Sequence, residues 1–106
     1  MKLLRASSSL DEAYTDFSGT IAQASTSQQL LPANRNRASF YIQNVDASAT
    51  LWINYTNAAA ASNGSFKLPP GAFLSEDGNF VSTEKINIFS TTQGAQFTCK
   101  EGGPIP

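Results

Sequence analysis

The sequence predicts an all-β domain: a small β-sandwich or jelly-roll-like fold with an extended N-terminal arm. β-branched and aromatic residues alternate with polar residues in several short runs, and turn signals recur roughly every 6 to 12 residues. No run keeps a convincing helical period. The 106 residues correspond to one domain. We expect residues 1–30 to form the arm or the first strands, residues 31–102 the sandwich core, and residues 103–106 a tail.

The densest apolar stretch in the first half of the chain predicts a β-hairpin. Phe40 and Ile42 would point to one face of a strand. Leu51 and Ile53 would share a face of the next strand, after a polar turn over residues 46–49. Two such runs around a short turn are typical of a hairpin. We therefore expect these four side chains to form one buried face, to which each contributes about 1.5–3 kcal/mol when fully buried.

The N-terminal stretch is less regular. Leu10, Tyr14 and Phe17 have the spacing of one side of a short helix, but Ser, Thr and Asp are frequent around them. We interpret residues 1–18 as an arm that is mobile or ordered by a partner, with a first strand that closes the sheet as the alternative. Deleting residues 1–18 should then weaken partner binding and leave the β fold intact.

Glycine and proline divide the rest of the chain into short strands. In Pro69-Pro70-Gly71 the second proline fixes φ and the glycine tolerates a positive φ, which predicts a firm turn. Phe97 and Cys99 would face inward in the last strand, Cys99 as a small hydrophobe. Strands are expected around Ile21 and over residues 28–31, 39–45, 50–55, 66–68, 72–75, 80–81, 85–90 and 95–100, with a loop over 56–65.

Charge and composition limit the partners. The net charge of −1 gives no electrostatic case for nucleic acid or an anionic membrane surface. No apolar run approaches the length of about 20 residues that spans a bilayer, and the apolar start is too short for a signal peptide. Only 14% of residues are charged, against about 25% in typical domains. A weakly charged polar surface suits a protein packed against other chains, and equally an ordinary small β domain.

Catalytic and metal chemistry have little support in the sequence. The chain has no histidine and one cysteine, which argues against zinc or copper sites and excludes an intrachain disulfide. The neighbouring carboxylates Asp11 and Glu12, like Glu76 and Asp77, lie in polar stretches that a solvated turn explains. Cys99 has only Lys100 beside it, which would point to the other face of a strand. We predict that the protein is not an enzyme and needs no cofactor.

Seven residues are candidates for binding a partner. Arg35 and Arg37 alternate with asparagines and could bind a carboxylate or phosphate, although a solvated loop also explains them. Trp52 could pack in a second layer or a subunit interface, where tryptophan is enriched. The alternative is that Trp52 and Tyr41 are platforms on which a sugar stacks. The candidates are Leu3, Leu4, Arg5 and Leu10 in the arm, then Arg35, Arg37 and Trp52.

Six short motifs carry a family resemblance between Leu31 and Gly102. They are Pro32–Arg35, Ile42–Val45, Leu51–Tyr55, Gly64–Gly71, Ile86–Ile88 and Phe97–Gly102. In this order the motifs resemble those of small tailed-phage virion proteins. The resemblance implies a capsid decoration (cement) protein that is made in the bacterial host cytoplasm, binds the major capsid protein on the head surface and often forms homotrimers. The alternative is a head-fibre or tail-associated adaptor, or a receptor- or glycan-binding module.

Overall fold

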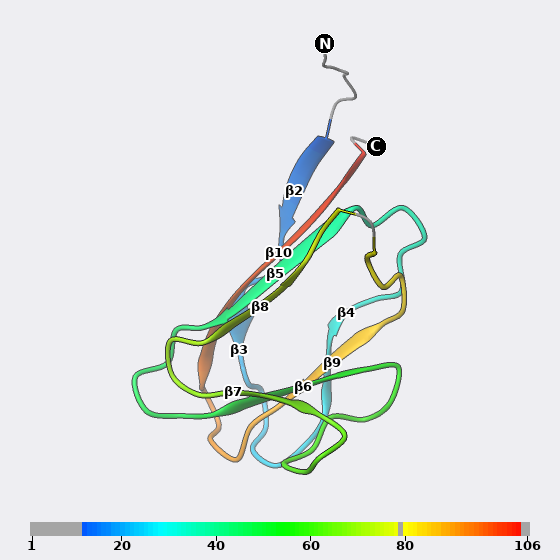
Figure 1. Ribbon diagram of the computed structural model, residues 1–106. Coiled ribbons are helices and arrows are strands. Elements are labelled where there is room, and N and C mark those ends of the chain that lie inside the picture. Colours follow the sequence, from blue (N-terminus) through cyan, green and yellow to red (C-terminus); the bar gives the residue numbers. More distant parts are fainter. Residues whose placement is uncertain (1–11, 79, 105–106) are drawn as a thin grey trace.

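The computed structural model, which describes residues 12–78 and 80–104, consists of two antiparallel sheets packed as a sandwich (Figure 1). One sheet has the strand order β2 (Glu12–Asp16), β10 (Gln96–Pro104), β5 (Ser39–Asn44) and β8 (Phe73–Glu76), and β3 (Gly19–Thr20) also pairs with β10. The other has the order β4 (Gln28–Leu31), β9 (Ile86–Phe89), β6 (Leu51–Tyr55) and β7 (Phe66–Leu68). The described residues include no helix, and so none that could cross a membrane. The predicted all-β class is confirmed.

The order of the strands is that of a jelly roll. β2 and β3 pair in turn with the same strand, β10, and act as one interrupted strand. Each sheet then has four strands, and almost every connection carries the chain from one sheet to the other. Only β6 and β7 are joined as neighbours within a sheet. The fold thus places residues far apart in the sequence on the same sheet face.

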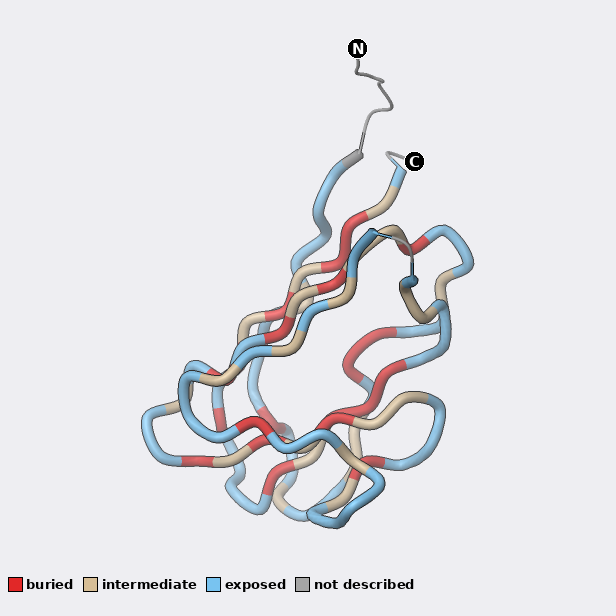
Figure 2. The backbone as a smooth tube through the Cα atoms, viewed as in Figure 1, coloured by how far each residue is buried: buried red, intermediate tan, exposed pale blue. Residues whose placement is uncertain are grey.

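The core lies between the two sheets, where Figure 2 shows the buried segments facing one another. Strand alternation builds it. In β10, for example, Phe97 and Cys99 are buried, as predicted. Lys100, between the buried Cys99 and Glu101, is half-exposed. The buried hydrophobic cluster consists of Ile21, Leu30, Leu31, Phe40, Ile42, Ala49, Leu51, Ile53, Leu68, Ile86, Ile88, Ala95, Phe97 and Cys99.

The predicted hairpin between β5 and β6 is wrong. β5 pairs with β10 and β8, whereas β6 pairs with β9 and β7, so residues 46–49 form an arch from one sheet to the other. The four side chains expected to share one face are all buried, but they meet across the core. A hairpin and an arch need the same alternation and the same short polar turn, so the pattern did not separate them.

The strand boundaries differ from expectation at two other places. Phe80 and Val81 are not in a strand. β10 continues through Pro104, so residues 103–104, which were expected in the tail, belong to the sheet. The turn after β7 is as predicted, because Gly71 has a φ of 84° and the Ala72 N–H donates to the Pro69 carbonyl at 3.0 Å. Residues 12–31 contribute three strands to the sandwich, which is the first-strand alternative for that stretch.

Candidate functional site

The structure separates the seven predicted partner-binding residues. Leu3, Leu4, Arg5 and Leu10 lie outside the described residues. Arg35 is exposed in a turn that the Arg37 N–H closes on the Asn34 carbonyl at 3.2 Å. Arg35 is exposed and Arg37 is buried, so the two arginines do not form one surface. The Arg37 side chain is 0% exposed, which corrects its prediction as a partner contact.

Arg37 instead holds one end of the sandwich together. Its Nε donates to Glu101 Oε2 at 2.7 Å, and the Glu101 side chain is only 9% exposed. Its two terminal nitrogens donate to the backbone carbonyls of Ser82, Glu84 and Pro32 at 2.7, 2.9 and 2.8 Å. One guanidinium therefore ties β10 to the segment after β4 and to the segment before β9. A planar guanidinium suits this role because its donors point in several fixed directions.

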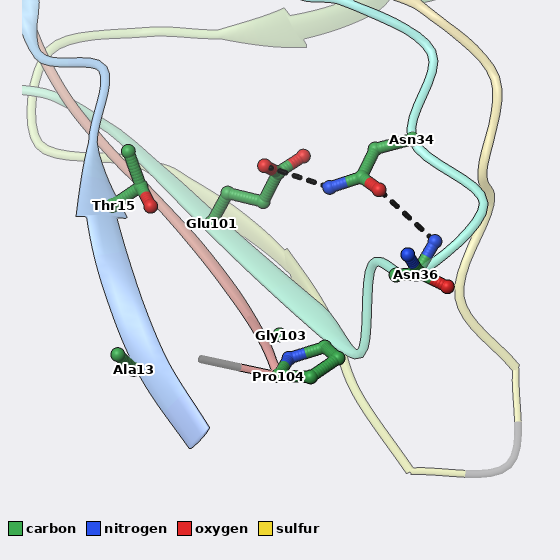
Figure 3. A pocket seen from close by; sticks show the side chains of 7 residues that line it. All are labelled: Ala13, Thr15, Asn34, Asn36, Glu101, Gly103 and Pro104. Carbon is green, nitrogen blue, oxygen red and sulfur yellow. Dashed lines mark hydrogen bonds between the residues drawn. The ribbon is translucent and has the colours of Figure 1, made fainter. Parts of the chain in front are cut away.

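A polar pocket of about 370 Å³ lies beside this ion pair (Figure 3). Asn34 Nδ2 donates to Glu101 Oε1 at 3.1 Å, and Asn34 Oδ1 accepts the Asn36 N–H at 3.0 Å. These bonds hold the Glu101 and Asn34 side chains in the wall of the pocket. Arg37 already neutralises the Glu101 carboxylate. The lining residues are Ala13, Thr15, Asn34, Asn36, Glu101, Gly103 and Pro104.

Trp52 and Tyr41, the two predicted sugar platforms, lie on different sheets. Trp52 in β6 is half-buried, and the Lys67 ammonium lies over its ring at 5.7 Å from the centroid. This cation–π contact covers one face of the indole. Tyr41 is in β5 of the other sheet, so the two aromatic rings cannot bind one ligand together.

Tyr41 has a different aromatic neighbour, Tyr14, which was expected in the arm. Their ring centroids are 5.9 Å apart with an interplanar angle of 61°. With Asp16 and Lys100 they line an open depression of about 480 Å³. The neighbouring Tyr14 hydroxyl and then the Asp77 carboxylate raise the pKa of Tyr41 to about 12, so this phenol stays protonated at neutral pH. Tyr14 was predicted only by the helical spacing of Leu10, Tyr14 and Phe17, so no sequence signal pointed to this pair.

A third surface feature is an apolar edge formed by β7, β8 and the loop after β8. β7 and β8 are the terminal strands of their sheets and follow one another in the chain (Figure 1). Phe66 in β7, Phe73 in β8 and Phe80 in the loop after β8 are 53%, 68% and 73% exposed. Phe66 packs against Tyr55, and Phe73 lies opposite Gln43 in β5. The three phenylalanines are among the five large hydrophobic side chains exposed in the described part of the chain. The sequence pattern did not single out these phenylalanines, because it predicts only short strands over 66–68, 72–75 and 80–81.

Two of the candidate catalytic carboxylates, Glu76 and Asp77, accept hydrogen bonds within the fold. Glu76 accepts the Tyr55 hydroxyl and the Ser82 N–H, both at 2.9 Å. Asp77 accepts the Tyr41 hydroxyl at 3.2 Å. No cluster of three or more potential metal-binding side chains is found among the described residues.

Cys99 is expected to be unreactive in the folded protein. Burial raises the pKa of its thiol to about 12, which suppresses the nucleophilic thiolate. At about pH 8, Ellman's reagent should label Cys99 slowly in buffer and completely in guanidinium chloride. Labelling within minutes in buffer would show instead that the thiol is accessible.

Comparisons with known proteins give one distant likeness. No family model and no curated protein matches the chain. One similar solved structure comes from work on Bacillus endospore appendages, described as a novel family of disulfide-linked pili. It is 15% identical, with a TM-score of 0.49, and the match covers 91% of this chain and 87% of that chain. We build no functional argument on a likeness this distant.

Proposed function

We propose that this protein is a non-enzymatic structural protein that acts by binding other chains, in the form of a decoration protein on a phage head. The observation that carries the proposal is the apolar edge of β7 and β8. A free edge strand offers unpaired backbone groups, and soluble monomers usually protect such edges with charges or proline. In β8 the edge carries Phe73 and Leu74 and has no lysine or arginine, and its one charge, Glu76, accepts hydrogen bonds from Tyr55 and Ser82. The only lysine of the two strands is Lys67 in β7, whose ammonium lies over the Trp52 ring.

The same edge suits the addition of a partner strand. In strand addition, backbone hydrogen bonds supply affinity and exposed side chains supply specificity. A specific contact needs about 800 Å² per partner. The apolar edge, the weakly charged surface and the phage-protein resemblance together support the major capsid protein as the partner, with a homotrimer as the bound form.

The predicted role of the N-terminal arm needs a narrower test. Residues 1–18 include β2, which pairs with β10 from Asp16 to Glu12. Deleting residues 1–18 would therefore uncover an edge of β10 as well as remove the arm. A deletion of residues 1–11 leaves β2 in place, and reduced particle binding by this variant would support a role for the arm.

Quantitative mass spectrometry of purified virions tests the function. We expect a copy number comparable to that of the major capsid protein, and absence from the particle would overturn the proposal. A copy number of only a handful would favour the head-fibre or tail-associated alternative. In the same assay, Phe73→Lys should reduce incorporation by about tenfold or more, since an edge lysine opposes strand addition.

A matched control lies on the opposite edge of the sandwich. Gln29 is exposed in β4, the terminal strand on that side. Gln29→Lys adds the same charge and should leave incorporation unchanged. Equal loss in the two variants would show an effect of charge and not of the apolar edge.

A further inference from the structure

The outer face of the first sheet brings four functional side chains together at one place. Lys100 lies opposite Asp16 in β2 on one side and opposite Tyr41 in β5 on the other. Residues paired directly across strands point to the same face, so these three side chains form a row. Tyr14 joins the row from the neighbouring position of β2, two residues before Asp16.

Gly102 makes room for the aromatic pair. It lies opposite Tyr14 on one side and Ser39 on the other, in the position between the two tyrosine-bearing strands. A Cβ atom at Gly102 would collide with the Ser39 hydroxyl and lie 3.1 Å from Tyr14 Cε1. The missing side chain lets the Tyr14 ring lean towards Tyr41. Gly102 lies within a strand, so a turn does not explain why a glycine stands at this position.

The two rings form an angled aromatic surface with an open side. Tyr14 is 62% exposed although it contacts Tyr41 edge to face. An aromatic face carries partial negative charge, and it attracts the weakly positive C–H groups on one side of a sugar ring. The depression has the size of a small-molecule site, which is about 300–1,000 Å³.

The polar groups around the rings suit hydroxyl groups. Asp16 supplies acceptors and Lys100 supplies donors, while a sugar hydroxyl can both donate and accept. Lys100 Nζ lies 3.4 Å from Asp16 Oδ1, so their charges offset one another. An anionic ligand would meet the carboxylates of Asp16 and Asp77, and an apolar ligand would desolvate the ion pair without replacing its hydrogen bonds.

We propose that Tyr14, Asp16, Tyr41 and Lys100 form a binding site for an uncharged saccharide, with one sugar ring stacked on Tyr14. The site is on the face opposite the polar pocket at Glu101, and it does not depend on the proposed decoration role. It differs from the predicted sugar platforms because Trp52, on the other sheet, takes no part.

The test is an NMR titration of the ¹⁵N-labelled full chain with neutral tetrasaccharides of glucose, galactose, mannose and N-acetylglucosamine. At least one sugar should shift the amide signals of Tyr14, Tyr41 and Lys100 at concentrations up to about 20 mM. Absence of shifts with the whole panel, or shifts centred on Trp52, would overturn the site. Tighter binding of a sialylated oligosaccharide than of every neutral one would overturn the uncharged class.

Variants separate stacking from structure. Tyr14→Ala should weaken binding by about tenfold or more, whereas Tyr14→Phe keeps the ring and should bind nearly as well as the native protein. Trp52→Ala is the matched aromatic control and should leave the affinity unchanged. The dispersion of the NMR signals shows directly whether each variant is folded. Undiminished binding by a folded Tyr14→Ala protein would contradict the proposal.

Discussion

Replacing Arg37 with alanine is expected to lower the free energy of unfolding by about 3–5 kcal/mol. The substitution leaves the buried carboxylate of Glu101 without its cation, and three backbone carbonyls lose a donor. Since whole domains are stable by only about 5–15 kcal/mol, the variant should be close to unfolding at physiological temperature. Urea unfolding followed by circular dichroism measures the change.

Two further variants show whether the ion pair is the cause. Arg35→Ala removes an exposed arginine from the same turn and should change stability by less than about 0.5 kcal/mol. Arg37→Met combined with Glu101→Leu removes both charges and should recover part of the loss, because an apolar pair avoids burying a charge alone. A loss of less than about 1 kcal/mol in Arg37→Ala would mean that the pair is not buried in solution.

The sequence could not show which of the two arginines is internal. Both lie in a polar loop with asparagines, and Arg37 is buried because Glu101, 64 residues later, reaches it from β10. The same long separation in sequence explains why the end of the chain was predicted to be a tail. A Glu-Gly-Gly-Pro segment resembles a flexible end, but the ion pair and the pairing with β2 and β5 make it the end of a strand.

The candidate saccharide site was only half predictable for the same reason. Tyr41 was recognised as an exposed aromatic residue on a strand, but its partner Tyr14 is 27 positions earlier, in a stretch that also fits a short helix. Local alternation predicts the face to which a residue points, and it contains no information on which strands are neighbours. In a jelly roll the neighbours are seldom consecutive, so Trp52, the nearer aromatic candidate, is on the wrong sheet.

The arch between β5 and β6 depends on Asn44, a buried polar residue at the end of β5. Its side-chain amide donates to the carbonyls of Ala49 and Leu68 at 2.7 and 2.8 Å, and its Oδ1 accepts the Asp46 N–H at 2.9 Å. Asn44 is 0% exposed, so these bonds are made away from water. They hold the arch and the end of β7 against β5.

Asn44→Ala is therefore expected to cost about 3 kcal/mol, since each buried group left without a partner costs about 1–3 kcal/mol. Gln43→Ala, the exposed neighbour in β5, should cost less than about 0.5 kcal/mol in the same urea titration. Hydrogen exchange should also become faster in residues 46–49 and 69–72, and less so in β9, if Asn44 acts on the arch. A uniform increase in exchange over both sheets would instead mean that Asn44 stabilises only the fold as a whole, and that residues 46–49 form the arch without it.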